Sequence, residues 1–432
     1  MDDAGSIRTD ALPLSEPEDL DPLLERIGEA RYVLLGEASH GTHEYYAWRA
    51  SLTRRLVQER GFSFVAVEGD WPDCYRVHRS VTLAADAPDD PKEALRGFER
   101  WPTWMWANSD VATFTQWLRE YNSSRTAEER VGFYGLDVYS LWDSLQATLG
   151  YLREHQPEHV ATALEAFQCF EPYAENPQAY AMATRLVPTS CEVEVVKLLR
   201  ELVTHPPPQR GGTPEERFDA EQNALAAAGA EAYYRAMVGG GPESWNVRDR
   251  HMVSTLERLM DFHGPEAKAV VWEHNTHVGD ARFTDMARAG MVNVGQLVRE
   301  AHDPSDVVVV GFGSHRGTVV AASAWGDPTR VMTLPPARPR STEALLHDCV
   351  GDGSQALFVF DGSPSAWHAT RRDHRAVGVV YRPEAERWGN YVPTVLGRRY
   401  DAFCWFDRTS ALSPLAGTHP DVGEAEAWPT GQ

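Results

Sequence analysis

Seven short runs rich in Val, Phe and Tyr recur along the chain and are typical of β-strands. Most of them are almost continuously apolar, which indicates strands covered on both faces, as in a mostly parallel sheet between layers of helices. We therefore predict an α/β fold with a mostly parallel central sheet flanked by helices. The runs are RYVLLGE (31–37), FSFVAVEGD (62–70), RVGFYGLDV (130–138), AKAVVWEHN (267–275), DVVVVGFGS (306–314), ALFVFDG (356–362) and HRAVGVVYR (374–382).

Two long stretches between these runs, roughly 73–122 and 140–263, have helical spacing and no strand signal. The second contains HPPPQRGGTP (205–214) and GGGPES (239–244), which divide it into separate helices. We predict one α/β catalytic domain over residues 21–410, with a large helical insertion at about 140–263. Residues 1–20 are expected to form a flexible N-terminal segment, and residues 411–432 a polar C-terminal tail.

Composition narrows the possible partners. The chain has 432 residues, 42% of them hydrophobic, and a formal net charge of -22 at pH 7. This charge repels phosphate backbones and anionic lipids, so neither nucleic acid nor a membrane is an expected partner. The five cysteines are widely spaced without a CxxC pair, which predicts separate buried thiols. No signal peptide or membrane-spanning segment is evident, so we expect a cytoplasmic protein; the sequence predicts no oligomeric state.

Polar residues stand where five of the predicted strands end. A single charged residue at a strand end is commonly just solvated, but repeated Glu, Asp and His favour a functional site. The carboxyl ends of parallel strands lie along one edge of a sheet, where ligands bind. In chain order the residues are Gly36, Glu37 and His40; Glu68 and Asp70; Asp137; Glu273, His274, Asn275 and His277; and Gly313, Ser314 and His315.

Two arginines lie on the apolar stripes of predicted helices. Such a buried guanidinium needs a carboxylate or an anionic ligand as its partner. Arg49 is only about 10 Å along the axis from a helix start at Thr42, so its side chain can reach Glu37 and His40. Either arginine could instead form a salt bridge that only holds its helix to the sheet. The stripes are Tyr45, Arg49, Leu52 and Leu56, and Trp245, Arg248, Met252, Leu256 and Leu259.

Several motifs together resemble the erythromycin esterase family, which includes proteins labelled succinoglycan biosynthesis proteins. The resemblance runs in order from about residue 20 to 410. It implies an α/β core with a helical insertion and hydrolysis of an ester, in the best-known members the macrolide lactone of erythromycin. The motifs are LLGEASHGTHEYYAWRASLTRRL, FVAVEGDWPDCYRVHR, GFERWPTWMW, GFYGLDVYSL, WNVRDRHM, KAVVWEHNTHVGDAR, VNVGQLVRE and GVVYRPEAER.

The resemblance also implies roles for individual residues. His40, in the GExxH turn with Glu37, matches the base that activates water. Arg49, Glu68, and the pair His274 and His277 match further family positions. Two positions depart from the expected pattern: Glu273 stands where a small residue is expected, and ERWGNYV (386–392) has no histidine before its tyrosine. Both departures bear on which substrate is used.

These residues suit hydrolysis of a small-molecule ester or lactone. His40, oriented by Glu37 or Glu68, could take a proton from water. Arg49 with His274 or His277 could then stabilise the oxyanion, typically worth about 3–4 kcal/mol per donor. Five further residues are predicted to contact the substrate, although tryptophans at such spacing are more often part of the hydrophobic core. They are Arg248, Asp70, His43, Trp104 and Trp106.

Four alternatives stay open. A Ser39 nucleophile is disfavoured because GEASHG lacks the G-x-S-x-G elbow. A divalent metal could be held by Glu37, His40, Glu68, His274 and His277, but an inward arginine disfavours a nearby cation, so no cofactor is expected. The same fold could instead serve a tailoring enzyme, an epimerase, cyclase or acyl transferase of natural-product or polysaccharide biosynthesis. A non-catalytic binding protein is the last alternative.

Overall fold

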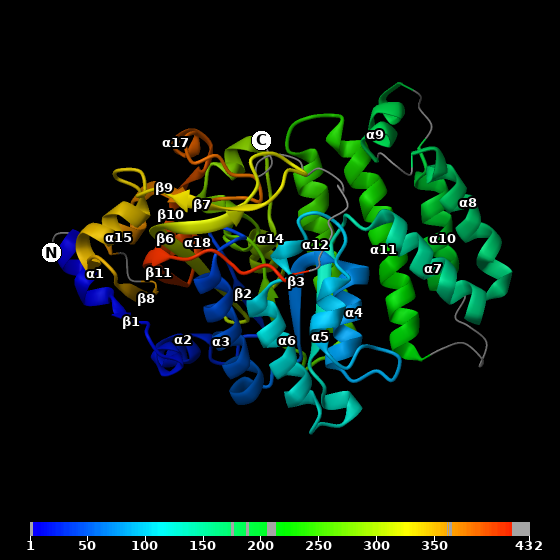
Figure 1. Ribbon diagram of the computed structural model, residues 1–432, viewed down its shortest axis with the longest axis horizontal. Coiled ribbons are helices and arrows are strands. Elements are labelled where there is room, and N and C mark those ends of the chain that lie inside the picture. The colour runs from blue at the N-terminus through cyan, green and yellow to red at the C-terminus, as the bar shows by residue number, and fades with distance from the viewer. Residues whose placement is uncertain are drawn as a thin grey trace.

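A computed structural model describes residues 3–173, 177–186, 190–204, 213–360, 362 and 365–416. Within these ranges nine strands form one sheet, in the order β1-β8-β11-β6-β2-β5-β3-β4 with β7 paired to β6 (Figure 1). Neighbours from β11 to β4 are parallel, whereas β8 runs antiparallel to β11 and β7 antiparallel to β6. The predicted α/β fold with a mostly parallel sheet is therefore confirmed.

Six of the seven predicted strands are present. The strands of the sheet are β1 (Leu12–Pro13), β2 (Tyr32–Leu35), β3 (Phe64–Asp70), β4 (Gly132–Asp137), β5 (Ala269–Trp272), β6 (Val307–Ala321), β7 (Arg330–Leu334), β8 (Gln355–Val359) and β11 (Ala402–Thr409). The predicted strand at 374–382 was wrong over most of its length. Strand β9 (Arg371–Arg375) already ends at Arg375, and it pairs with β10 (Tyr391–Val395) and not with the central sheet. The sequence also did not predict β11, which lies between β8 and β6.

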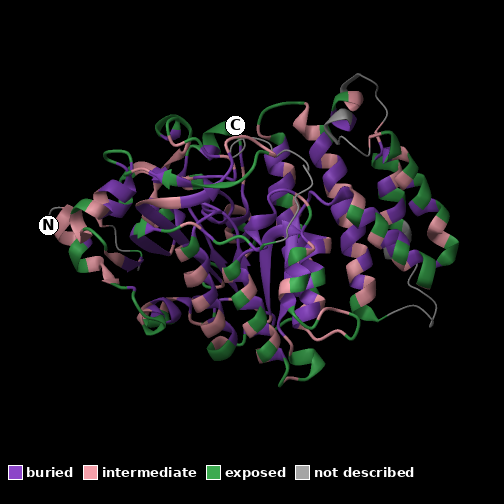
Figure 2. Ribbon diagram, in the orientation of Figure 1, coloured by how far each residue is buried: buried purple, intermediate pink, exposed green. Residues whose placement is uncertain are grey.

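Helices cover both faces of the sheet. Val33 and Leu35 of β2 pack in one core with α3 and α6, whereas Leu34, one position away, packs on the other face with α12 and α14. Figure 2 shows the strands as the most buried part of the molecule. The helices outside the insertion are α1 (Asp3–Asp10), α2 (Asp21–Ile27), α3 (His43–Arg60), α4 (Trp71–Val81), α5 (Pro91–Arg96), α6 (Ser109–Asn122), α13 (Asn275–Val278), α14 (Val294–Ala301), α15 (Thr342–Val350), α16 (Ala366–Ala369), α17 (Glu386–Gly389) and α18 (Leu396–Arg399).

The described part of the segment between β4 and β5 contains helices and connecting turns and no strand. Its helices are α7 (Leu141–His155), α8 (Val160–Phe170), α9 (Pro177–Leu186), α10 (Glu192–Thr204), α11 (Pro214–Met237) and α12 (Glu243–His263). Figure 1 shows α7 to α11 gathered at one end of the molecule, where they share a core of their own. The breaker HPPPQRGGTP falls mostly outside the described residues. The prediction of five separate thiols was wrong for two of the cysteines, because Cys169 and Cys191 form a disulfide. The other three cysteines are thiols.

The two chain ends also differ from expectation. Residues 3–20, predicted to be flexible, form α1, β1 and a short 3-10 helix, because Ile7 is buried and Asp10 accepts a 2.8 Å hydrogen bond from Trp367. At the other end, Leu412 N–H donates to Gly41 O at 3.0 Å. The rest of the predicted polar tail, 417–432, lies outside the described residues. No described helix combines the length and apolarity that crossing a membrane requires.

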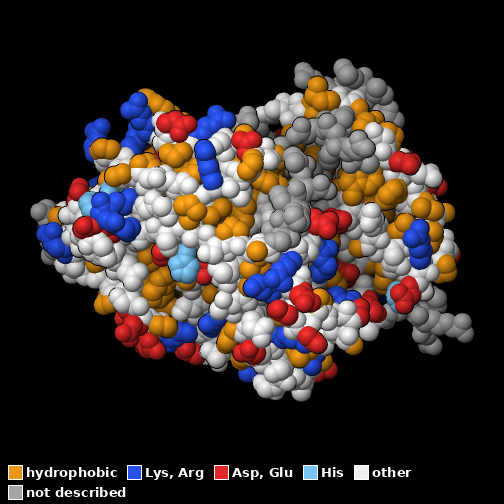
Figure 3. All heavy atoms as spheres, in the orientation of Figure 1, with side chains coloured by type: hydrophobic (Ala, Val, Ile, Leu, Met, Phe, Trp, Pro, Cys, Tyr) orange, Lys and Arg blue, Asp and Glu red, His pale blue; other side chains and the backbone are white. Residues whose placement is uncertain are grey.

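The surface mixes charges of both signs. On the face shown in Figure 3, acidic and basic side chains are interspersed with hydrophobic ones.

Candidate active site

Four neighbouring strands bring the predicted residues together. The order β2-β5-β3-β4 places the carboxyl ends of these strands side by side. The turn after β2 carries Glu37 and His40, the end of β3 carries Glu68, and the turn after β5 carries His274 and His277. All five side chains are buried. The fifth predicted strand end was wrong, because β6 continues past Ser314 and His315 to Ala321.

Glu37 links a histidine to an arginine. Its Oε1 lies 2.9 Å from Nδ1 of His40, and its Oε2 accepts a 2.8 Å hydrogen bond from Nη2 of Arg49. The turn can approach β5 closely because residue 36 is glycine: a Cβ there would lie 2.0 Å from Oδ1 of Asn275. Arg49 is fully buried on its helix, as its stripe predicted. Its guanidinium lies 4.2 Å from the ring centre of Tyr46.

Arg248 joins two carboxylates from adjacent strands. Its Nε and Nη2 donate to the two oxygens of Asp137 at 2.9 and 2.7 Å, and Nη2 also donates to Oε1 of Glu68 at 2.9 Å. Burial alone would raise the pKa of Asp137, but the Arg248 charge and hydrogen bonds lower it to about 2. Asp137 is therefore ionised at neutral pH, and the arginine has the counter-charge that its burial requires.

His277 is held from both ring edges. Its Nδ1 lies 3.0 Å from each oxygen of Asp249, and its Nε2 lies 3.4 Å from Oε1 of Glu68. The ring stacks on Trp245 with 4.4 Å between centroids. Burial raises the pKa of Asp249 well above its usual range, although the Arg248 charge opposes this shift. The sequence analysis did not single out Asp249, although it directly follows Arg248 in WNVRDRHM.

His274 stands between the two networks. Its backbone N–H donates to Oε2 of Glu68 at 2.8 Å, and its ring centroid lies 4.9 Å from that of His40. Nδ1 accepts a hydrogen bond from the backbone N–H of Thr276 at 3.3 Å. Burial lowers the pKa of His274 well below its usual range, so the ring is neutral. Nδ1 also lies 2.8 Å from Oγ1 of Thr276, and a hydrogen bond with the backbone of Ala38 opposes the pKa shift.

Glu273 is the unusual residue of the cluster. It is fully buried, and neither carboxyl oxygen has a hydrogen-bond partner among the described residues. Burial, followed by repulsion from Glu68, raises its pKa well above the usual range. A protonated carboxyl group is the expected form at neutral pH.

Of the predicted substrate contacts, Arg248, Asp70 and Trp106 lie at the cluster. Arg100 donates to both oxygens of Asp70 at 2.6 and 3.2 Å, and Trp106 Nε1 donates to the Glu68 carbonyl at 2.9 Å. Arg100 was not predicted from the sequence. With Glu68 and Asp137 these residues line a cavity of only about 20 Å³. A space of this size holds about one water molecule.

Trp104 and His43 lie elsewhere. Trp104 lines a separate pocket of about 350 Å³ with Trp101 and Asp327. Contrary to the prediction, His43 does not lie at the cluster: its side chain is 47% exposed and pairs with Asp110 of α6 at 2.9 Å. It is the first residue of α3, where the chain has already turned away from His40 toward the neighbouring helix.

The predicted metal ligands do not form a ligand set. Among the described residues, one group of three places its ligand atoms within 4.8 Å of one another, and it is His315, His347 and Asp407. Glu37, His40, Glu68, His274 and His277 are instead divided between the Arg49 and Arg248 networks.

A parallel sheet with buried histidines, carboxylates and arginines at its carboxyl edge is the architecture of an α/β enzyme. The family model described as Erythromycin esterase matches residues 57–409. The chain belongs to the erythromycin esterase family and is a hydrolase of that family. The match includes Glu68, Arg248, His274 and His277, and it begins after the turn that carries Glu37 and His40.

Individual relatives are distant in sequence. Erythromycin esterase type II of Escherichia coli is 22% identical over 324 residues, which cover 70% of this chain and 74% of that protein. A crystal structure of a succinoglycan biosynthesis protein superposes with a TM-score of 0.78 at 22% identity, covering 96% of this chain and 98% of that one. A mutant of erythromycin esterase EreC in its open conformation gives a TM-score of 0.68 at 17% identity, covering 94% and 96%. These structures support the fold.

Proposed function

We propose that this protein hydrolyses a carboxylic ester or lactone by water that His40 activates. The observation that carries the proposal is the buried contact of Glu37 with both His40 and Arg49, at 2.9 and 2.8 Å. A carboxylate that accepts the Nδ1 proton of His40 leaves Nε2 with its lone pair, so the imidazole can act as a base. Arg49 holds the second oxygen of this carboxylate in place through a charge-assisted hydrogen bond.

His274 supplies the donor that such a reaction needs. In the tautomer that we infer for neutral His274, Nδ1 accepts from the Thr276 backbone at 3.3 Å and lies 2.8 Å from the Thr276 hydroxyl, so Nε2 carries the proton. This N–H is buried near the backbone of Ala38, and its ring lies next to that of His40. We assign it to the oxyanion that forms when water adds to the carbonyl carbon.

The reaction then proceeds in two steps. His40 takes a proton from water as the water oxygen bonds to the carbonyl carbon. The tetrahedral intermediate collapses with cleavage of the carbon–oxygen ester bond, and His40 returns the proton to the leaving alkoxide. Arg248 and His277 hold Glu68, which fixes the backbone of His274.

The cavity beside Glu68 is too small for such a substrate, so the proposal requires an opening motion. The erythromycin esterase EreC mutant was crystallised in an open conformation. We propose that this chain also opens, with the segment 98–106 moving away from Glu68.

Mass spectrometry tests the proposed reaction. The purified protein would be incubated with erythromycin and a panel of esters and lactones in water labelled with oxygen-18, with and without a chelator. We expect a product that gains one labelled oxygen in both conditions. Loss of activity with chelator would favour a metal-dependent hydrolase, and a product of unchanged mass would favour an isomerising tailoring enzyme.

Variants connect the reaction to the site. His40→Ala should lower turnover by about two orders of magnitude or more while the circular dichroism spectrum stays unchanged. His43→Ala is the matched control, because the exposed side chain of His43 lies three residues away and pairs with Asp110 of α6. Turnover near wild type in His40→Ala would remove His40 from the role of base.

A further inference from the structure

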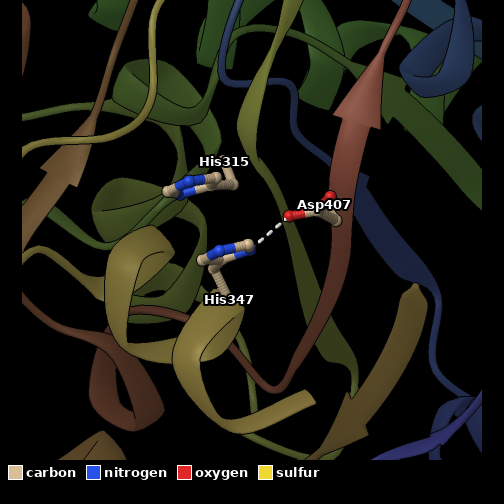
Figure 4. Close-up of side chains that lie close together, drawn as sticks. All are labelled: His315, His347 and Asp407. Atoms are coloured by element: carbon tan, nitrogen blue, oxygen red, sulfur yellow. Dashed lines mark hydrogen bonds and ion pairs between the residues drawn. The ribbon is translucent and has the colours of Figure 1, made fainter. Parts of the chain in front are cut away.

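A second cluster of titratable side chains lies on the part of the sheet that the proposed reaction does not use. His315 stands in the middle of β6, and Asp407 stands on β11. Phe406 pairs with Ser314 and Arg408 with Arg316, so Asp407 lies beside His315 on the neighbouring parallel strand. His347 comes from α15, which packs against both strands. Three elements far apart in sequence therefore converge here (Figure 4).

The ligand atoms of this cluster are already close. One atom from each of His315, His347 and Asp407 lies within 4.8 Å of the others. Nδ1 of His347 lies 2.6 Å from Oδ1 of Asp407, and the two imidazoles stack with 4.0 Å between centroids and 2° between planes. Figure 4 shows both rings on the same side of Asp407.

The carboxylate of Asp407 is held with one oxygen toward the histidines. Its Oδ2 accepts hydrogen bonds from the Gly353 N–H at 2.8 Å and from Arg316 at 3.4 Å. Oδ1 contacts His347. Arg316 also pairs with Asp352, so a second carboxylate shares its charge.

His315 supplies an independent reason to expect a ligand. Its side chain belongs to a residue only 6% exposed, and its Nδ1 has no hydrogen-bond partner among the described residues. A buried polar atom left unsatisfied costs about 1–3 kcal/mol and calls for an explanation. His347 is 27% exposed and gives the cluster an opening to solvent.

We propose that His315, His347 and Asp407 bind one divalent transition metal ion of the zinc class. Two imidazole nitrogens and one carboxylate oxygen are a common donor set for Zn²⁺, with water in the fourth position. Mg²⁺ and Ca²⁺ prefer all-oxygen sites and fit less well. Tetrahedral bonds of about 2.0–2.1 Å put ligand atoms about 3.3 Å apart. The ligand atoms, which lie within 4.8 Å of one another, would therefore have to move closer together when the ion binds.

The bound ion would link α15 to the central strands. None of the three ligands belongs to the networks of Glu37 or Glu68, so the site is separate from the proposed catalytic groups. Ser314, which precedes His315, accepts a 2.8 Å hydrogen bond from Tyr45 of α3, the helix that carries Arg49. Metal binding is therefore expected to stiffen this side of the sheet more than to change the chemistry.

Zinc titration of the untagged, chelator-treated full chain tests the proposal. Isothermal titration calorimetry with Zn²⁺ should show one tight equivalent for the wild type, and Co²⁺ should give the visible absorption of a four-coordinate site. His347→Ala and Asp407→Asn should each weaken Zn²⁺ binding at least about tenfold. His347→Ala is the main variant, because His347 is partly exposed in the last turn of α15 and its removal should leave the core intact.

His43→Ala is the matched control, since it removes a histidine from an exposed histidine–aspartate pair that has no third ligand. It should bind Zn²⁺ as the wild type does. A Zn²⁺-dependent rise in Tm for the wild type but not for His347→Ala would agree with the proposal. Absence of saturable binding, or equal binding by wild type, His347→Ala and Asp407→Asn, would overturn it.

Discussion

Arg49 and Glu37 form an ion pair of 2.8 Å in which neither side chain has more than 1% of its surface exposed. The desolvation of two such charges is offset only while both partners are present, because each supplies the counter-charge for the other. The third member, His40, depends on the same carboxylate. Stability and the proposed chemistry therefore share one contact.

Removal of the arginine should expose this dependence. Arg49→Met leaves the Glu37 carboxylate buried without a counter-charge and is expected to lower the free energy of unfolding by about 3–5 kcal/mol. Urea denaturation followed by circular dichroism measures the change. The double variant Arg49→Met/Glu37→Gln should lose less than Arg49→Met alone, because no uncompensated charge remains.

A surface pair on the same helix is the control. Arg55 contacts Glu59 at 2.7 Å, but both side chains reach solvent. Arg55→Ala is expected to cost less than about 1 kcal/mol. Equal losses in Arg49→Met and Arg55→Ala would contradict the energetic role assigned to burial.

Asp249 is expected to position His277 rather than to react. In the wild type, the Val294 N–H donates to Oδ1 of Asp249 at 3.0 Å. Asp249→Asn keeps an oxygen for this bond but places an amide N–H₂ next to Nδ1 of His277. The fold should persist, while turnover falls at least about tenfold because an amide cannot exchange a proton with Nδ1 of His277 as a carboxyl group can. Steady-state kinetics and the urea midpoint, measured on the same preparation, separate the two effects. A loss of stability without a change in kcat would assign Asp249 a structural role only.

Glu273 makes the stability of the protein depend on pH. Burial raises its pKa in the folded state above the ordinary value of 4.5. The folded chain then holds this proton more tightly than the unfolded chain, so the free energy of unfolding falls as pH rises from about 4.5 toward the folded-state pKa. Glu273→Gln replaces the titrating carboxyl group with an amide that does not titrate. The variant should exceed wild type by about 1–3 kcal/mol at pH 8, and the difference should shrink toward pH 5. A constant difference across this pH range would mean that Glu273 does not titrate with folding.

The sequence predicted the part of the site that follows from strand ends and helix stripes. Glu37, Glu68 and His277 follow apolar runs, and the inward position of Arg49 follows from helical spacing, because both patterns are local. Their convergence required only that the strands be parallel. His43 was misplaced because proximity in sequence to His40 does not determine the direction of a side chain on the first turn of a helix.

The missed features depend on contacts between distant segments. Asp407 lies beside His315 only through the pairing of β11 with β6, 92 residues apart in sequence. Strand β11 itself was missed although it begins with the continuous apolar run AFCWF (402–406). The Cys169–Cys191 disulfide joins residues 22 positions apart, and no CxxC motif in the sequence indicates it. Neither pairing has a local signal.

The disulfide should stabilise the helical insertion. Closing a loop of 22 residues restricts the unfolded chain and is worth about 3 kcal/mol in the loop-entropy model. Reduction with dithiothreitol, or Cys169→Ser/Cys191→Ser, should therefore lower the midpoint of urea denaturation. Cys404→Ser, which alters a buried thiol outside the insertion, separates loss of the crosslink from loss of a thiol; no effect of reduction on the midpoint would contradict the prediction.

Entry of substrate should be limited by the segment 98–106. Arg100 ties this segment to Asp70 with contacts of 2.6 and 3.2 Å, and Trp106 ties it to the Glu68 carbonyl. Together they leave about 20 Å³, whereas drug-sized ligands occupy sites of about 300–1,000 Å³. Arg100→Ala removes one tether, so the segment should open more often. Hydrogen–deuterium exchange read by mass spectrometry should rise about tenfold or more in 98–106 and stay unchanged in α3.

Arg119→Ala is the control for this experiment, because Arg119 binds Asp89 and the Ser80 carbonyl and has no contact of this kind with Asp70. Its exchange in 98–106 should match wild type. If the segment limits entry, Arg100→Ala should also lower KM for a bulky ester more than for a small one, since only the bulky ester needs the wider opening. Unchanged exchange in Arg100→Ala would place the entrance elsewhere, and the pocket of about 350 Å³ beside Trp104 would be the next position to test.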